Sequence, residues 1–161
     1  MRSSPYISRR LRHFAALFVV AFAVNGCAIK LVPDYDGVTF EEIIKVGKKV
    51  DRFYGDVLET KSTDRPYQKF SERYVEIETD IRSLVTRNSA RALNEESTQI
   101  SEIILKLWVK YKDNHKLKDT YSDGNAKLDR NRFIRLFSSA ASAEVAKKLD
   151  PDDKNAEKDS K

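Results

Sequence analysis

The sequence of 161 residues is poor in the side chains that build most metal and redox sites. It contains one cysteine, one methionine and two histidines, and only Cys27 and His115 among these lie beyond the first 26 residues. A single cysteine excludes an intrachain disulfide, so stability must come from packing. A haem site would need two axial ligands, and the Glu-x-x-His pairs of a di-iron bundle are missing. We therefore predict no metal and no cofactor.

An apolar run long enough to cross a bilayer is also missing near the start of the chain. The run from Phe14 to Val24 has 11 residues, whereas a transmembrane helix needs roughly 20. Arginines precede this run and small residues follow it, which is the layout of a cleavable signal peptide over residues 1–26. The arginines are Arg2, Arg9, Arg10 and Arg12.

The segment Val24-Asn25-Gly26-Cys27 resembles the lipobox of bacterial lipoproteins. This resemblance implies cleavage between Gly26 and Cys27, a diacylglyceryl group on the Cys27 thiol, and acylation of the new amino group by a chain such as palmitate. Each acyl chain contributes on the order of 10 kcal/mol of membrane binding at ~0.8 kcal/mol per methylene. Ala28 follows in place of Asp, which implies the outer membrane, facing the periplasm. The alternative is a secreted protein with an incidental cysteine.

Most of the positive charge belongs to the predicted signal peptide. The chain has 30 Lys and Arg against 25 Asp and Glu, and four of the arginines but none of the acids lie in residues 1–26. The remainder therefore has 26 basic and 25 acidic residues. Nucleic-acid binding depends on clustered cations that neutralise phosphates, so we expect no nucleic-acid partner.

Three-four spacing of apolar residues predicts four amphipathic helices within residues 39–149, and no strand-like alternation is present. The first helix covers residues 39–59, with Thr39 as N-cap, Glu42 as its capping-box partner, and a staple of Val38 against Ile43. The second follows Pro66 and is the most regular. Its stripe consists of Tyr67, Phe70, Tyr74, Ile77, Ile81, Leu84 and Asn88.

The third helix is predicted to open at Asn94, and the fourth at Asp129 with Leu128 stapled against Phe133. The apolar face of the third consists of Ile100, Ile103, Ile104, Leu107, Trp108 and Tyr111, with His115 one turn further. The fourth carries Ile134, Phe137, Ala140, Ala141, Val145 and Leu149. Its small residues 138–143 would let a neighbouring helix approach closely.

Residues 119–125 are predicted to be a turn and not a calcium loop, because Arg130 stands where a bidentate Glu is required. Short turns between four helices indicate an all-α, up-down-up-down four-helix bundle over residues 39–149. A lipidated Cys27 and short linker over residues 27–38 precede the bundle. Residues 150–161 are charged and poor in apolar residues, which predicts a disordered tail.

Two sets of residues are candidates for binding. Arg82, Arg87 and Arg91 could face lipid headgroups, a polyanion or an acidic partner, and the alternative is a salt-bridged surface. Trp108 and His115 could line a small-ligand pocket, and the alternative is a half-buried histidine at the end of an apolar stripe.

Catalysis has little support in the sequence. His115 is the only ready general base near neutral pH, and no cysteine is free to act as a nucleophile. Acid-base catalysis by paired carboxylates is an open alternative, although acidic residues on helices usually belong to a solvated face. These acids are Glu41, Glu42, Glu76, Glu78 and Asp80. We predict that the protein is not an enzyme and has no catalytic residues.

Scattered positions on the predicted helices carry a further resemblance: Tyr35-Asp36, Phe53, Leu58-Glu59, Tyr74, Asp80, Leu84, Arg87, Asn94, Gln99-Ile100 and His115. In these positions the chain is similar to a loose group of small, helical bacterial lipoproteins of unknown function. The resemblance covers most of the chain after Cys27. It implies a bundle anchored in the cell envelope and supplies no activity.

Together these features predict a lipid-anchored envelope lipoprotein that acts as a non-catalytic binding or accessory bundle. Its partners would be the membrane, through the lipid on Cys27, and an envelope protein. One alternative is an immunity or exclusion lipoprotein that protects against an incoming toxin or conjugation apparatus. Another is a small-ligand carrier that uses the interior near Trp108 and His115.

Overall fold

The computed structural model describes residues 32–149, which contain four α-helices and no strand. The helices are α2 (Gly37–Glu59), α3 (Ser71–Ser89), α4 (Glu95–Lys118) and α5 (Asp123–Ala146). Short 3-10 segments, η1 (Ser62–Asp64) and η2 (Tyr67–Phe70), join α2 to α3, and η3 (Lys147–Leu149) follows α5. The predicted all-α fold is confirmed. The predicted signal peptide, Cys27 and the tail of residues 150–161 lie outside the described residues.

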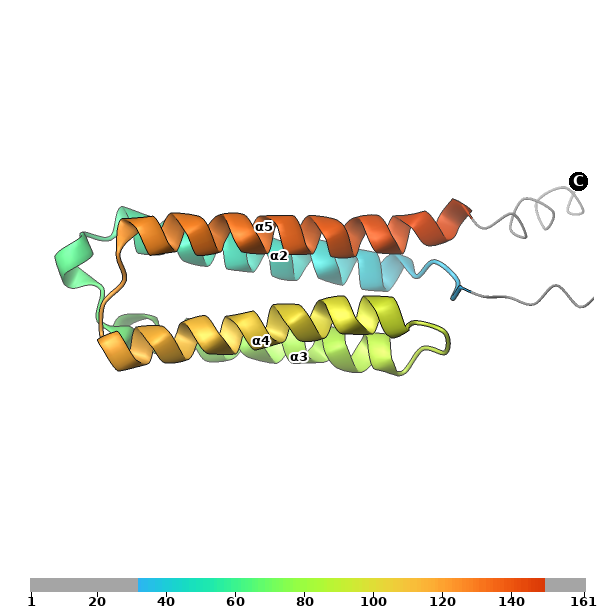
Figure 1. The fold of residues 1–161 in the computed structure, drawn as a ribbon, viewed down its shortest axis with the longest axis horizontal. Helices are drawn as coiled ribbons and strands as arrows, with labels where there is room; N and C mark the ends of the chain where they lie inside the picture. Colours follow the sequence, from blue (N-terminus) through green and yellow to red (C-terminus); the bar gives the residue numbers. More distant parts are fainter. Residues whose placement is uncertain (1–31, 150–161) are drawn as a thin grey trace, which may run out of the picture. The chain divides into compact units, whose positions relative to one another are not determined.

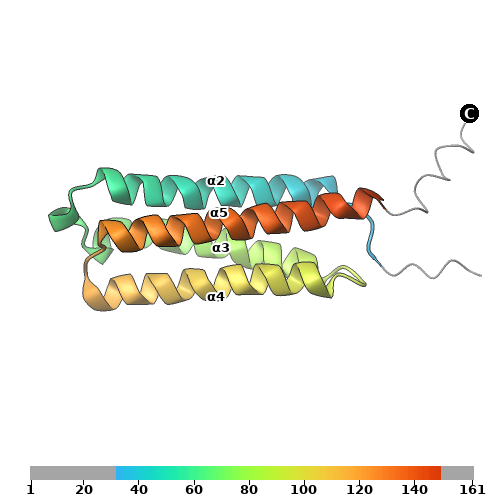
Figure 2. The ribbon, with the colours of Figure 1, turned by 45° about the horizontal axis from the view of Figure 1, so that its top comes forward.

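The four helices lie side by side with their axes roughly aligned (Figure 1 and Figure 2). The most extensive contacts are those of α2 with α5 and of α3 with α4, while α4 and α5 touch least among the neighbouring pairs. Residues 32–36 enter the bundle at the end where α5 finishes and where the loop from α3 to α4 lies (Figure 1). We call this the tether end.

Helix α2 begins two residues before the predicted start, and its N-cap is Asp36, not Thr39. The Asp36 carboxylate accepts a hydrogen bond from the backbone N–H of Val38 at 3.0 Å and from the Thr39 hydroxyl at 2.6 Å. A carboxylate can accept both bonds and also carries the negative charge that a helix N-terminus favours. Thr39 is instead fully buried inside the first turn.

The predicted hydrophobic staple of this helix is also wrong. Val38 is 58% exposed, so it does not cover Ile43. With Asp36 as N-cap, the staple positions become Tyr35 and Phe40, whose ring centroids lie 6.4 Å apart. The shift follows directly from the earlier cap.

The stripe predicted for the second helix is confirmed, because its last six positions are buried and Tyr67 is partly buried. The first two positions, Tyr67 and Phe70, lie on η2 and not on an α-helix. Pro66 cannot donate a backbone hydrogen bond, and α3 starts only at Ser71.

Helix α5 begins at Asp123, six residues before the predicted start, so the predicted turn of residues 119–125 is shorter than expected. Asp119 ends α4 in the left-handed conformation, and the Ser122 hydroxyl caps α5 by accepting from the Asn125 N–H at 3.2 Å. Asp129 therefore lies within α5 and is buried, and no Leu128 staple forms.

Several side chains predicted to be inside are exposed. Ile103 is 48% exposed, Ile134 46% and Val145 40%, because α4 and α5 turn neighbouring positions toward the core. A close contact between α2 and α5 lies at Gly47, where an added Cβ would be 3.1 Å from the Phe137 ring of α5. Phe137 precedes the run of small residues 138–143.

Candidate functional site

The predicted site residue Trp108 lies in the middle of the core. Its ring centroid is 5.2 Å from that of Phe53, 5.2 Å from that of Tyr74 and 5.6 Å from that of Phe133. Its indole N–H donates to the backbone carbonyl of Tyr74 at 3.0 Å, and the side chain is fully buried. Trp108 is therefore enclosed by rings that it packs against.

His115 is also buried, and both of its ring nitrogens are engaged. Nε2 lies 2.9 Å from the carbonyl oxygen of Arg65, and Nδ1 lies 3.1 Å from the Tyr74 hydroxyl. A carbonyl only accepts, so Nε2 carries the hydrogen and Nδ1 accepts from the hydroxyl. Burial lowers the pKa of His115 below its ordinary value, although the Arg65 carbonyl opposes this shift. The imidazole is a neutral structural link between α4 and the segment before α3.

A cleft of about 220 Å³ opens between α4 and α5 next to His115. Inside it, the Tyr121 hydroxyl donates to Asp129 at 2.6 Å, and Arg132 donates to the Tyr111 hydroxyl at 2.6 Å. Burial raises the pKa of Asp129, although the Tyr121 hydrogen bond opposes this. These polar groups are mostly directed at one another.

The three predicted arginines do not form one cluster. Arg82 pairs with Glu78 within α3 at 2.7 Å, Arg87 pairs with Glu42 of α2 at 3.0 Å, and Arg91 pairs with Glu144 of α5 at 3.1 Å. The three partners therefore lie on three different helices. Arg82 and Arg87 form ion pairs at the surface, whereas the partner of Arg91 is buried.

A buried ionic network at the tether end was not predicted from the sequence. Glu144 is 1% exposed and accepts from Lys147 at 2.5 Å, from Arg91 at 3.1 Å and from the Asp36 backbone N–H at 2.8 Å. Lys147 also donates to the Asn94 side chain at 2.7 Å. The sequence gives no signal for it, because its members lie on the predicted linker, a turn and a helix end.

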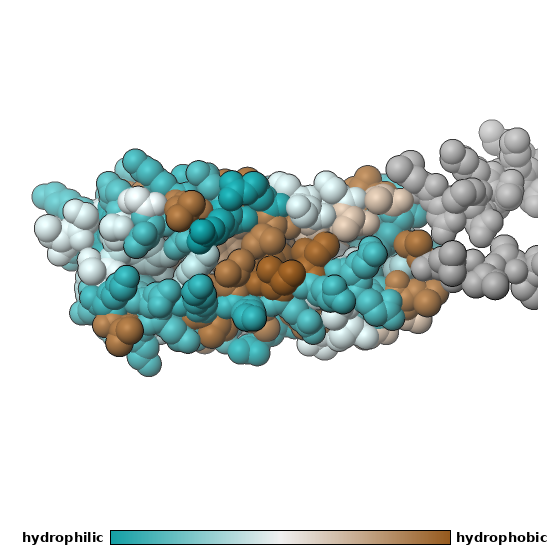
Figure 3. Space-filling view, in the orientation of Figure 1, coloured by the Kyte–Doolittle hydropathy of each residue, from teal (hydrophilic) through white to brown (hydrophobic). Residues whose placement is uncertain are grey.

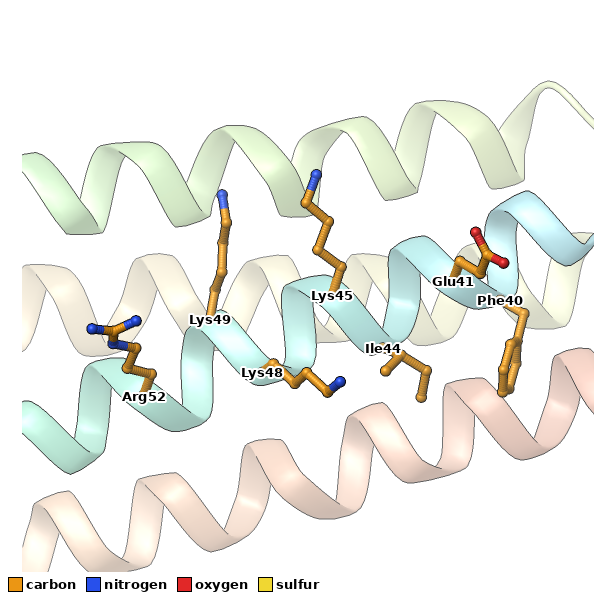
Figure 4. A pocket seen from close by; sticks show the side chains of 7 residues that line it. All are labelled: Phe40, Glu41, Ile44, Lys45, Lys48, Lys49 and Arg52. Atoms are coloured by element: carbon orange, nitrogen blue, oxygen red, sulfur yellow. The ribbon is translucent and has the colours of Figure 1, made fainter.

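A second feature that sequence reasoning missed is an open groove of about 450 Å³ along α2, which we call the α2 groove. Phe40 and Ile44 provide its apolar surface and extend toward α5 in Figure 4. The polar residues that line it are Glu41, Lys45, Lys48, Lys49 and Arg52.

Only one of the cations in the α2 groove is paired within the described part of the chain. Lys49 binds Glu76 and Asp80 of α3, both at 2.7 Å. Lys45, Lys48 and Arg52 form no ion pair with any residue between 32 and 149. Their three-four spacing puts them on one exposed face of the helix, which is the sequence signal that could have identified the groove.

Figure 3 shows a second apolar area, which lies between α4 and α5 on the face drawn in Figure 1. Exposed Ile103 and Ile134 belong to these two helices. This apolar area belongs to other helices than the α2 groove.

Among residues 32–149, no group of three or more His, Cys, Asp or Glu side chains is arranged to hold a metal ion. None of the helices described here is both long and apolar enough to cross a membrane. Comparisons with protein-family models, with curated proteins and with solved structures gave no match.

Proposed function

We propose that this protein is a lipid-anchored lipoprotein of the bacterial cell envelope, and that its bundle is a non-catalytic accessory module. In this proposal the α2 groove binds an acidic, partly apolar segment of an envelope protein. The observation that carries the proposal is an apolar floor beside three cations, on one helix face, that form no ion pair with residues 32–149. Complementary charge selects such a partner and speeds its association, while the apolar contact adds binding energy.

The anchor is proposed from Val24-Asn25-Gly26-Cys27, with cleavage before Cys27 and export to the outer membrane. We also propose an up-down-up-down order for the helices. Support comes from the short connections, since residues 90–94 join α3 to α4 and residues 119–122 join α4 to α5.

Incorporation of labelled palmitate tests the anchor. The intact protein should take up label, and Cys27→Ser should not. Label on both proteins, or on neither, would contradict a lipid at this position.

Crosslinking in intact cells tests the α2 groove. A photoreactive residue in place of Glu41, which lines the groove, should capture an envelope protein. The triple reversal of Lys45, Lys48 and Arg52 to Glu in the same protein should abolish capture. A matched control makes the same change in charge on α4 and α5, with Lys106, Lys127 and Arg135 reversed to Glu. Equal loss in both variants would show a general effect of charge and reject the groove.

A small-ligand carrier is a second candidate, favoured by the cleft beside His115. Its polar lining includes Lys110, Lys118 and Arg132, so we propose small anions as ligands. Trp108 fluorescence and thermal stability should change when a phosphate or carboxylate metabolite binds. No change across a panel of such metabolites would exclude this function.

A further inference from the structure

The chain that leads from Cys27 is fixed to the tether end of the bundle by several contacts. The Arg91 guanidinium donates to the Asp34 carbonyl as well as to Glu144, and the Asp36 N–H donates to Glu144 at 2.8 Å. The Lys148 ammonium lies 4.0 Å from the centre of the Tyr35 ring. These contacts therefore fix the position of residues 34–36 on this end of the bundle.

The tether end displays a leucine in an unfavourable backbone conformation. Leu93 has φ of 60° and is 48% exposed, in the loop between α3 and α4. A left-handed backbone disfavours a residue with a Cβ, and glycine is its usual occupant. The loop is nevertheless held firmly, because Arg91 and Asn94 on either side belong to the buried network around Glu144. Strain that is retained in this way indicates a functional constraint.

Other exposed apolar side chains lie near the same end. Val38 in the first turn of α2 is 58% exposed, Val145 near the end of α5 is 40% exposed, and Val32 is 42% exposed. The exposed charges there have both signs, as Lys148 and Glu95 illustrate. A surface of this kind suits an apolar contact more than an electrostatic one.

The length of the tether limits what can cover this end. Asp34 is seven positions after Cys27, and a fully extended chain of that length reaches at most about 25 Å. A helix of the length of α4 extends about 36 Å, so the anchor point cannot reach the opposite end of the bundle. With a lipid on Cys27, the tether end is therefore the end of the bundle that can meet the bilayer at the anchor point.

We propose that the tether end rests on the lipid surface, with Leu93 inserted at the level of the headgroups and Val32, Val38 and Val145 around it. This inference depends on the proposed lipid on Cys27. Exposed apolar side chains on a rigid element bind at the interface by burying area there. The contact should change little with salt, because the charges at this end are mixed.

The test uses the full lipidated protein in vesicles made of equal parts of phosphatidylethanolamine and phosphatidylglycerol. Because the only native cysteine carries the lipid, Leu93→Cys adds a single free thiol for an environment-sensitive fluorophore. Leu117→Cys is the matched control, since Leu117 is 84% exposed and lies on the last turn of α4, at the opposite end. Val145→Cys is a second probe, used if Leu93→Cys does not fold.

The label at position 93 should shift to the blue and be quenched by quenchers attached to lipid, and the label at position 117 should show neither change. Equal signals at both positions in lipidated protein would overturn the proposal. A blue shift without quenching, seen only when envelope proteins are added, would show that a protein covers this end, which also overturns the proposal. If Cys27 carries no lipid, its own thiol takes the label, and the anchor itself has failed.

Leu93→Gly separates a membrane role from a purely structural one. Glycine relieves the left-handed backbone, so thermal stability should rise. Loss of the side chain should lower the equilibrium constant for lipid contact on the order of tenfold. The label at position 145 measures this constant. Higher stability with unchanged lipid contact would reject the proposal.

Discussion

Replacing Glu144 with glutamine should destabilise the bundle more than any exchange of a surface charge. The Glu144 carboxylate is 1% exposed and lies between Lys147, whose side chain is 6% exposed, and Arg91. Glutamine keeps the shape but removes the negative charge, which leaves two cations facing an amide in a buried site. Breaking a buried ion pair in this way costs about 3–5 kcal/mol of unfolding free energy.

Urea unfolding followed by Trp108 fluorescence measures this loss, because Trp108 is the only tryptophan and is fully buried. The control is Asp64→Asn, which removes an exposed pair with Lys69 and should cost about 0–1 kcal/mol. A double variant, Glu144→Gln with Lys147→Met, should recover part of the loss, since the more deeply buried of the two uncompensated cations is gone. A loss below about 1 kcal/mol for Glu144→Gln, or no recovery in the double variant, would refute the reasoning.

Three further predictions concern individual residues of the bundle. Tyr54→Phe should be neutral or stabilising by up to about 1 kcal/mol, because its buried hydroxyl has no hydrogen-bond partner among residues 32–149. Tyr74→Phe should cost about 1–2 kcal/mol, because it leaves a buried imidazole nitrogen unpaired, and urea unfolding compares the two variants. Burial lowers the pKa of His115 from its ordinary value of 6.5. Below pH 6.5 the unfolded chain therefore binds a proton that the folded chain does not. The melting temperature should therefore fall as pH drops through 6.5 and level off above it, and a profile that stays flat across this range in wild type would contradict a neutral buried imidazole. Gly47→Ala should cost about 1–3 kcal/mol of unfolding free energy, because its Cβ would lie 3.1 Å from a ring of α5. Gly55→Ala should stabilise the fold by about 0.5–1 kcal/mol, because nothing lies within 4 Å of its Cβ. Calorimetry that gave both changes the same sign would be inconsistent with this packing.

The binding residues were harder to predict than the fold. Trp108 and His115 are aromatic and lie on a helical stripe, and such residues usually belong to the core, which is where the structure places them. The cations of the α2 groove have a helical spacing in the sequence, but spacing does not show which cations lack a partner. Lys49 has the same charge as Lys48 and is neutralised only because Glu76 and Asp80 of α3 happen to face it.

The four amphipathic helices within residues 39–149 could be predicted from the sequence alone, because an apolar residue at every third or fourth position is a local property of the chain. The sequence also determined most of the buried stripe of α3. Helix starts were less certain, since Asp36 and Thr39 are both good caps and only the surrounding contacts select between them.

Which charges are buried depends on how the helices pack. Glu144 and Lys147 lie three positions apart on a helix end and resemble an ordinary exposed pair in the sequence. They are enclosed because Asp36, Arg91 and Asn94, each distant along the chain, meet them at one end of the bundle. Contacts between distant segments depend on how the helices pack against one another, and this information is spread over the whole chain.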